Sequence, residues 1–338
     1  NCVPAEGTHI QYRTLGRTGI RVSEIGLGAW ELGGAYFLRD RSSSNVDPAG
    51  YDDVSEQAAI DMLRWGLDHG LTFIDTAPVY GNGESERRVA RALARRSETV
   101  TVETKLGVFA DEGHYRRLFS REVVLRECER SRERLGVQTI DIDLLHSPSR
   151  QEFGAGEALD AMQELKAQGK VRWIGVSASY DVQHTLELLA TGVLDVLQIP
   201  LSILQPDFAY EVLPEALARN VGVVVREPLA NGYLTGAFDE QTRFGADDQR
   251  SLWPVERHLL SVRKARSLEF LIQPGRSLAQ ASLAWVLAQP GVSTVIPGSA
   301  NQEQLAWNLA ASDVPRLSDG ELARVAELQR TNFGLPVG

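Results

Sequence analysis

The sequence has few cysteines and no long apolar run. Its two cysteines, Cys2 and Cys128, form neither a metal-binding spacing nor a disulfide framework. This usage is typical of a reducing compartment, so we expect a cytoplasmic protein. No apolar run approaches the roughly 20 residues that a membrane-spanning helix needs, so we expect no membrane partner.

Basic residues are in deficit. The formal net charge is −10, from 35 Lys and Arg against 45 Asp and Glu. Binding to a phosphate backbone needs a basic face, so this balance argues against nucleic acid as a partner. What is present is ordinary for a globular protein: 338 residues, of which 43% are hydrophobic and 24% are charged.

The first residues resemble no targeting signal. The chain begins at Asn1 rather than Met, and residues 1–10 lack the charged and apolar segments of a signal peptide. We expect them to be a tail left by processing or cloning. Residues 11–330 are predicted to form one domain, since single α/β barrels reach this length.

From residue 25 onward, short apolar strands alternate with amphipathic helices. Strands are expected at 25–28, 73–75, 100–105, 143–146, 173–177, 196–199, 223–226 and 294–296. Helices are expected at 55–69, 84–93, 121–135, 157–168, 182–190, 212–219, 255–271, 277–288, 303–311 and 318–330.

Eight such units favour an α/β fold of one type, a single (β/α)8 TIM barrel. No Gly-x-Gly-x-x-Gly follows the first strand, which counts against a Rossmann domain. A β-hairpin at 11–23 would cap the barrel floor, and the extra C-terminal helix would pack outside the ring. The polar segments 36–51 and 239–254 are expected to be long loops, the first of them mobile.

Polar side chains fall at the expected carboxyl ends of the strands, where barrels of this kind carry their chemistry. They are Trp30, Asp75, Lys105, His146, Ser177, Gln198 and Arg226, with Tyr80 in the loop after Asp75. Each has a simpler explanation: Lys105 could extend into solvent, and His146 could be a turn histidine. Four ionisable groups at one barrel mouth are harder to explain in this way.

These groups suit the reduction of a carbonyl. The Lys105 ammonium would lower the pKa of Tyr80, and Asp75 would hold Lys105 in place. His146 could donate a hydrogen bond to a substrate oxygen, and Tyr80 would then act as general acid. No nucleophile is placed for acyl transfer and no cluster has metal-ligand spacing. A carbonyl reduction needs a hydride source, which indicates a nicotinamide cofactor.

Taken together, residues 11–330 resemble the aldo-keto reductase superfamily. The matching motifs are Phe73-Ile74-Asp75-Thr76-Ala77-Pro78-Val79-Tyr80-Gly81, Thr104-Lys105, Leu144-Leu145-His146, Ile174-Gly175-Val176-Ser177, the segment 228–236 and Ile296-Pro297-Gly298-Ser299. The resemblance implies a catalytic tetrad of Asp75, Tyr80, Lys105 and His146.

The resemblance also implies a cofactor site. Ser177 and Gln198 would hold the nicotinamide carboxamide, and Arg226 stands where an aromatic residue usually stacks on the ring. The segment 228–236 would fold over the pyrophosphate. The remaining implied residues are Pro228, Leu229, Asn231, Leu234 and Gly236 in that segment, and Pro297, Gly298, Ser299, Gln304 and Asn308 near the adenosine.

Two further departures from the family pattern bear on the cofactor. Ala178 replaces the usual Asn after Ser177, which removes one amide contact. The segment 299–308 lacks the Lys or Arg that grips the 2′-phosphate of NADP. We therefore expect NAD(H) or NADP(H) nearly equally, with a slight lean to NADP(H).

The substrate is expected to be a small carbonyl or alcohol compound, such as an aldehyde, a ketone or a sugar. Trp30, Tyr80, Phe109 and His146 are the candidate substrate residues, and the protein could be a monomer or a homo-oligomer. Two alternatives stay open. One is a redox-sensing regulatory subunit, like the β subunits of voltage-gated potassium channels. The other is an aldolase-type barrel that uses Lys105 as a Schiff base.

Overall fold

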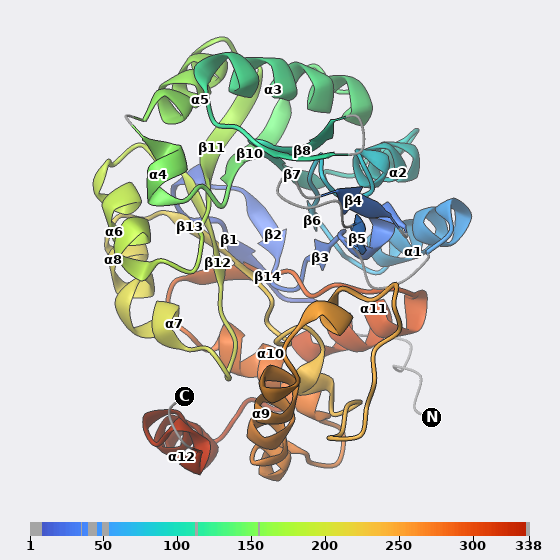
Figure 1. Cartoon of the computed structure of the whole chain (residues 1–338), viewed down its shortest axis with the longest axis vertical. Helices are drawn as coiled ribbons and strands as arrows, with labels where there is room; N and C mark the ends of the chain where they lie inside the picture. The colour runs from blue at the N-terminus through green and yellow to red at the C-terminus, as the bar shows by residue number, and fades with distance from the viewer. Residues whose placement is uncertain are drawn as a thin grey trace.

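Eight parallel strands form the barrel in this computed structural model, which describes residues 9–34, 36–39, 46–48, 54–111, 114–154 and 156–335 (Figure 1). The ring closes where the first strand meets the last, through bridges that pair Ile25 with Val295 and Gly28 with Gly298. In order around the ring, the strands are β3 (Leu27–Gly28), β6 (Phe73–Asp75), β7 (Thr101–Leu106), β10 (Ile140–His146), β11 (Val171–Ser177), β12 (Val196–Pro200), β13 (Gly222–Arg226) and β14 (Val292–Val295). The predicted (β/α)8 barrel is confirmed.

Helices surround the strands, and most begin at a side chain that caps the first turn. Ser55, Ser120, Asp181, Ser277 and Ser318 each accept a hydrogen bond from the backbone N–H three residues on. The helices are α1 (Glu56–Asp68), α2 (Glu84–Leu93), α3 (Arg121–Leu135), α4 (Arg150–Phe153), α5 (Glu157–Ala167), α6 (Val182–Ala190), α7 (Asp207–Glu211), α8 (Leu213–Ala218), α9 (Val255–Arg266), α10 (Leu278–Leu287), α11 (Gln302–Leu309) and α12 (Asp319–Arg330).

The barrel floor is closed by the predicted hairpin, β1 (Tyr12–Thr14) with β2 (Arg21–Ser23). Its turn fits closely under β13, where a Cβ on Gly16 would lie 2.2 Å from the backbone nitrogen of Gly222. From the hairpin, Leu15 and Val22 join the apolar side chains that fill the interior: Phe73, Ile142, Leu144, Val196, Val224 and Ile296. Because the interior is filled, access to the barrel is from its other end.

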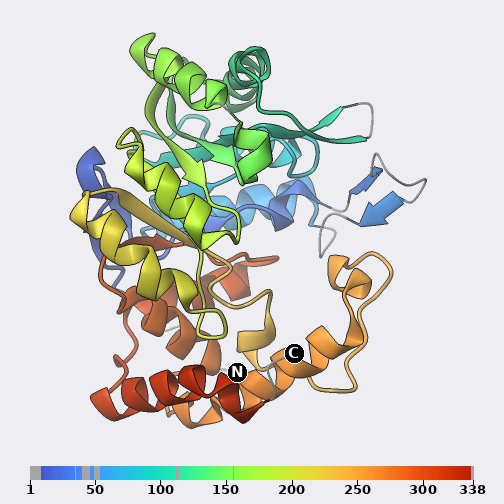
Figure 2. The ribbon, with the colours of Figure 1, turned by 60° about the vertical axis from the view of Figure 1, so that its left-hand side comes forward.

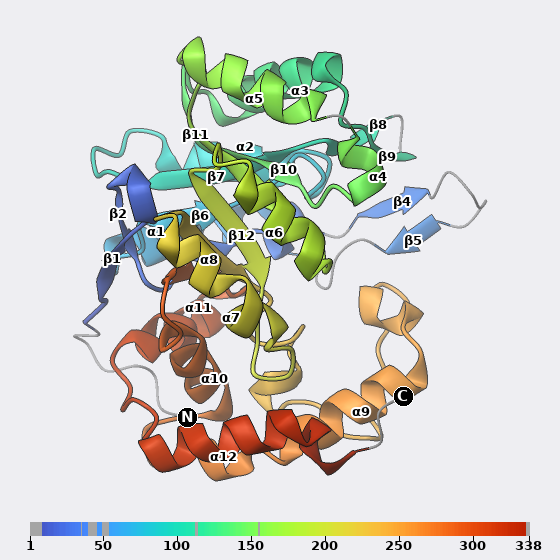
Figure 3. The ribbon, with the colours of Figure 1, turned by 90° about the vertical axis from the view of Figure 1, so that its left-hand side faces the viewer.

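A four-stranded sheet lies outside the barrel and corrects two expectations. It has the order β5 (Val46–Pro48), β4 (Phe37–Arg39), β9 (His114–Arg117), β8 (Val108–Asp111), and it stands out from the ring in Figures 2 and 3. The segment 36–51 was expected to be a loop without strands, and 106–120 was assigned no structure. These strands pair mainly with one another rather than with the ring, so the βα alternation gave no signal for them. The rest of segment 36–51, and residues 1–8 of the expected tail, lie outside the described residues.

The C-terminal helix α12 packs beside α9, away from the ring (Figure 3). Arg276 is 2% exposed and pairs with Glu321 of α12. The guanidinium of Arg324 lies 3.8 Å from the centre of the Phe270 ring. Within the part of the chain that the structure describes, no helix combines the length and the apolar character needed to cross a membrane.

Candidate active site

The carboxyl ends of β6 and β7 bring a carboxylate and an ammonium into contact. The side chains of Asp75 and Lys105 are 4% and 1% exposed and form an ion pair. Nζ of Lys105 also donates to the carbonyl oxygen of Thr76 at 2.9 Å and to the hydroxyl of Tyr80 at 3.1 Å. An ammonium has three protons, and these three bonds use them all. Lys105 is thus a fixed buried cation and does not extend into solvent.

Tyr80 lies in the turn after β6, and a close approach of two glycines shapes that turn. Gly81 has φ of +61°, and a Cβ at this position would lie 2.2 Å from the carbonyl oxygen of Gly33. Only a residue without a side chain allows two backbones to come so near. The contact brings the turn of Trp30 over Tyr80, with ring centroids 5.2 Å apart.

The pKa of Tyr80 corrects a prediction made from the sequence. We expected Lys105 to lower it, but in the structure the pKa of Tyr80 is raised well above its usual range. Burial is the largest cause, and the negative charge of Asp75 is the next, while Arg226 lowers the pKa. Burial outweighs the nearby positive charges because a phenolate here would lose its hydration, and because Asp75 offsets the charge of Lys105. Tyr80 therefore holds its proton at neutral pH.

His146 and Arg226 face the same barrel mouth from β10 and β13. The His146 ring stands edge-on to Tyr80, with centroids 6.1 Å apart and an angle of 85°. Burial, aided by the charges of Lys105 and Arg226, lowers the pKa of His146 well below its usual value. Nδ1 of His146 and Nε of Arg226 are buried and meet no hydrogen-bond partner among the described residues. A bound ligand could use both atoms, and a neutral His146 could donate from one of its nitrogens.

Arg226, which departs from the family pattern, contacts Ala178, which also departs from it. It forms an ion pair with Glu227, and it donates to the carbonyl oxygen of Ala178 at 3.1 Å. Its guanidinium also lies 5.0 Å from the centre of the Tyr180 ring. Ala178, which replaces the usual Asn, thus accepts a hydrogen bond from Arg226, which replaces the usual aromatic residue. Whether Arg226 stacks on a nicotinamide ring remains a prediction.

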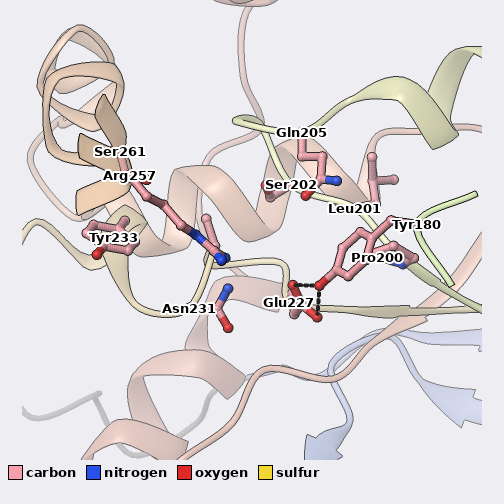
Figure 4. A pocket seen from close by; sticks show the side chains of 11 residues that line it. Tyr180, Pro200, Leu201, Ser202, Gln205, Glu227, Asn231, Tyr233, Arg257 and Ser261 are labelled. Atoms are coloured by element: carbon pink, nitrogen blue, oxygen red, sulfur yellow. Dashed lines mark hydrogen bonds between the residues drawn. The ribbon is translucent and has the colours of Figure 1, made fainter. Parts of the chain in front are cut away.

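A cleft of about 380 Å³ opens beside Glu227 and the segment 228–236 (Figure 4). Glu227, Ala230 and Asn231 have φ of +56°, +49° and +56°, so the segment turns sharply. The lining residues are Tyr180, Pro200, Leu201, Ser202, Gln205, Glu227, Ala230, Asn231, Tyr233, Arg257 and Ser261. Asn231 is the residue of this lining that the resemblance assigned to the cofactor.

Gln198 is turned into the barrel. Its Nε2 donates to Asp75 at 2.8 Å and to Glu103 at 2.6 Å, and its Oε1 accepts a hydrogen bond from Ser177 at 2.9 Å. Both amide protons are therefore used inside the protein. The resemblance assigned Ser177 and Gln198 to the nicotinamide carboxamide, but in this arrangement Gln198 has only a second lone pair on Oε1 to offer.

Glu103 is not among the site residues predicted from the sequence. Its spacing from Lys105 could have indicated it, because residues two apart on one strand place their side chains on the same face. Glu31 was also missed. Its carboxylate lies against Gly298, where a Cβ would be 2.2 Å from Oε1.

The segment expected to meet the adenosine is held by its own side chains. Nδ2 of Asn308 donates to Oγ of Ser299 at 3.1 Å, and Oε1 of Gln304 accepts from the backbone N–H of Ala300 at 2.8 Å. Asn301 caps α11. In the structure these side chains shape the loop, and their contact with a cofactor remains a prediction.

Phe109 lines a different cleft from the one beside Glu227, and its place in the substrate site remains a prediction. Phe109 is 4% exposed, and the guanidinium of Arg126 lies 5.7 Å from its ring centre. It lines a separate cleft of about 260 Å³ with residues of α2 and α3, and neither Trp30 nor Tyr80 lines that cleft. Residue 109 belongs to β8, which pairs with β9 rather than with a strand of the ring, and the cleft is also lined by Pro78 and Asn82 from the loop that carries Tyr80.

The fold and the placement of these groups define the class of protein: a (β/α)8 barrel with a buried Asp–Lys–Tyr arrangement at the carboxyl ends of its strands. The model of the Aldo/keto reductase family matches residues 24–330, and the chain belongs to this family.

Similar proteins agree with this assignment. The chain is 33% identical to an NADH-specific methylglyoxal reductase of Escherichia coli, over 93% of this chain and 97% of that protein. It is similar to the structure of a glycerol dehydrogenase from Gluconobacter oxydans, with a TM-score of 0.77 and 26% identity over 99% and 98% of the two chains. An aldo-keto reductase from Klebsiella pneumoniae in complex with NADPH gives a TM-score of 0.69 and 26% identity over 95% and 96%.

Proposed function

We propose that this protein is an NAD(P)(H)-dependent oxidoreductase that interconverts a carbonyl and an alcohol, with Tyr80 as general acid and base. One observation carries the proposal: the hydroxyl of Tyr80 is held 3.1 Å from the Lys105 ammonium, which is itself ion-paired with Asp75. A nicotinamide cofactor, when bound, supplies or accepts the hydride.

Each side chain has a separate task in reduction. Tyr80 gives its proton to the carbonyl oxygen as negative charge develops there. Lys105, fixed by Asp75 and Thr76, stabilises the phenolate that remains. Neutral His146 donates a hydrogen bond to the same oxygen and fixes its position. In oxidation the same groups act in reverse.

The side chains at the barrel mouth suit a nicotinamide cofactor, but the segment 299–308 does not favour the 2′-phosphate that distinguishes NADPH from NADH. Nδ1 of His146 and Nε of Arg226, which have no hydrogen-bond partner among the described residues, are consistent with a polar ligand beside Tyr80. The segment 299–308 carries no Lys or Arg, and it contains Glu303. Because a carboxylate repels a phosphate dianion, and because the relative from Escherichia coli is named NADH-specific, we propose that NADH is used at least as well as NADPH.

For the substrate we propose a small, oxygen-rich aldehyde or ketone. The stacked rings of Trp30 and Tyr80 offer an apolar surface, and Arg226 and His146 add polar groups. One relative is named for methylglyoxal, a small dicarbonyl compound, and another for glycerol, a small triol. A single domain over 11–330, a cytoplasmic location and either a monomer or a homo-oligomer belong to the same proposal.

The test is multiple-turnover oxidation of NADH and of NADPH by the purified protein, with methylglyoxal, glyceraldehyde and simple sugars. We expect many turnovers per protein molecule and a preference between the two cofactors far below a thousandfold. A single turnover followed by retention of the oxidised cofactor would favour a redox-sensing regulatory subunit instead. A strong preference for NADPH would contradict the cofactor proposal.

The aldolase alternative needs Lys105 as a free amine. In the structure its ammonium makes three hydrogen bonds and is ion-paired, so it is a poor nucleophile. Borohydride trapping of a substrate adduct on Lys105 would revive that alternative.

A further inference from the structure

Glu103 is a carboxyl group in the barrel interior to which the proposed reaction assigns no role. It is completely buried, and its register partner on the adjacent strand β6 is Asp75. The two carboxyl groups come from neighbouring strands and meet the same amide, that of Gln198 on β12. Two carboxyl groups that share one donor in a dry interior strongly disfavour both being ionised.

No cation among the described residues forms a hydrogen bond or an ion pair with Glu103, although the charge of Lys105 acts on it from a distance. The ammonium of Lys105 lies on the same strand, but its protons go to Asp75, Thr76 and Tyr80. On the other strands that face Glu103, Asp75 is acidic and Gln198 is uncharged. Oε1 of Glu103 accepts from Gln198, and Oε2 meets no donor within the described part of the chain. An ionised Glu103 would therefore be a buried charge without a partner, which is costly.

We infer that Glu103 is a positioning residue that acts as a neutral acid. It donates a hydrogen bond to Asp75 and accepts one from Gln198, and so it connects the amide of Gln198 to Asp75, Lys105 and Tyr80. This inference rests on the proposed function for its kinetic consequences. The chain then runs from Gln198 and Glu103 through Asp75 and Lys105 to Tyr80, and it holds a single negative charge opposite a single positive one.

The electrostatics agree with this assignment. Burial, and next the charge of Asp75, raise the pKa of Glu103 well above its usual value, and a hydrogen bond with Asp75 acts in the same direction. The charge of Lys105 and the hydrogen bond from Gln198 lower it, but burial and Asp75 outweigh them. If Glu103 loses its proton at alkaline pH, a second negative charge appears beside Asp75. That charge raises the pKa of Tyr80, so Tyr80 becomes a poorer acid. Reduction should therefore lose rate as Glu103 ionises.

The Glu103→Gln variant distinguishes a neutral acid from a carboxylate. The glutamine amide can donate from its NH2 group to Asp75 and accept from Gln198 at its carbonyl oxygen, as a protonated glutamate can with its hydroxyl and its carbonyl oxygen. We expect kcat for reduction at neutral pH to stay within about threefold of wild type, since no hydrogen bond is lost. We expect the alkaline limb of the kcat/KM profile to move up by roughly one pH unit, because residue 103 can no longer ionise.

Glu103→Leu removes both hydrogen bonds while keeping the volume. We expect kcat to fall by about tenfold to a hundredfold, as for a buried partner left unsatisfied. A Glu103→Gln variant that loses activity as severely as Glu103→Leu, or whose pH profile superimposes on that of wild type, would overturn the inference.

Infrared spectroscopy of the protein without cofactor tests the same inference without relying on activity. We expect a carbonyl band of a protonated carboxylic acid at neutral pH that disappears in Glu103→Gln. Asp143→Asn is the matched control: it changes another buried carboxyl group and should remove a different component, with no effect on the pH profile. If the band assigned to Glu103 is absent, the inference fails, whereas the proposed function fails separately if Tyr80 proves dispensable.

Discussion

At the scale of single residues, Asp143 is a buried carboxyl group that is poorly satisfied by the described residues around it. Asp143 on β10 is completely buried, and neither carboxyl oxygen makes a hydrogen bond of normal geometry with a described residue. Burial, and next the charge of Glu86, raise the pKa of Asp143 well above its usual value. Such a group lowers the free energy of unfolding unless it gains a partner.

We therefore predict that Asp143→Leu stabilises the protein. Removing an unsatisfied buried polar group should add about 1–2 kcal/mol and raise the melting temperature by a few degrees. Because the pKa of Asp143 is raised in the folded state, its unfavourable contribution grows as the pH rises above the usual range of Asp. The gain measured by calorimetry should accordingly be larger at pH 8 than at pH 5.

Asp141 provides the matched control, two residues earlier on the same strand. It accepts a hydrogen bond from the backbone N–H of Val102 at 3.2 Å and pairs with Arg172 at 3.2 Å. Asp141→Leu should lower the melting temperature. Destabilisation by Asp143→Leu at both pH values would show that Asp143 has a partner after all.

The same scale shows which site residues the sequence could predict. Asp75 and Lys105 stand at expected strand ends, and the ion pair between them follows from strand order alone. The orientation of Gln198 could not be predicted, because it depends on Glu103, whose side chain enters the barrel only through the register of β6 and β7. The raised pKa of Tyr80 also depends on burial, which a sequence does not quantify.

At the scale of elements, the turn after β6 is held by the backbone of the turn after β3. We predict that Gly81→Ala separates these turns, since the new Cβ would lie 2.2 Å from a backbone oxygen that cannot move freely. A displacement of about 1 Å can cost a hundredfold in rate, so kcat/KM should fall by about tenfold or more. Steady-state kinetics and thermal unfolding measure the two effects.

Gly136 controls for backbone strain in that experiment. It has a similar φ of +68°, it caps α3, and a Cβ there would meet nothing within 4 Å. Gly136→Ala should lose about 1–2 kcal/mol of stability, the cost of the left-handed conformation, and keep its activity. Equal activity in the two variants would mean that the approach of Gly33 to Gly81 does not position Tyr80.

Elements that alternate regularly could be predicted, and those outside the alternation could not. The bounds expected for α2, α3 and α6 agree with the structure. Ser120 and Gly136 cap the two ends of α3, Asp181 caps the start of α6, and the left-handed Gly83 precedes α2. The strands β4, β5, β8 and β9 were not predicted, because they form a small sheet of their own without the regular alternation of strand and helix. Phe109 lies on β8, so the alternation gave no basis for the direction of its side chain.

At the scale of the whole molecule, the barrel brings together side chains that are distant in the sequence. Asp75, Lys105 and His146 come from β6, β7 and β10, which are adjacent in the ring, while Gln198 comes from β12 across the interior. In a closed ring of parallel strands, the carboxyl ends of all strands lie at the same end of the barrel. This explains why the strand ends alone identified most of the candidate site. The residues that the resemblance assigned to the cofactor in 228–236 and 297–308 lie outside the strands, in loops and in α11, so the strand pattern does not orient their side chains.

The central claim is that the Tyr80 hydroxyl transfers the proton, and Tyr80→Phe tests it most directly. Phe keeps the ring that stacks on Trp30 and removes only the hydroxyl that Lys105 contacts. Tyr210→Phe, on the exposed side of α7, is the matched control and should behave as wild type.

We predict that Tyr80→Phe lowers kcat for carbonyl reduction by a factor of about 10²–10⁴, the usual contribution of a positioned acid, while NADH titrated by fluorescence binds with unchanged affinity. Full turnover by Tyr80→Phe, with methylglyoxal or any other carbonyl that the wild type reduces, would contradict the account.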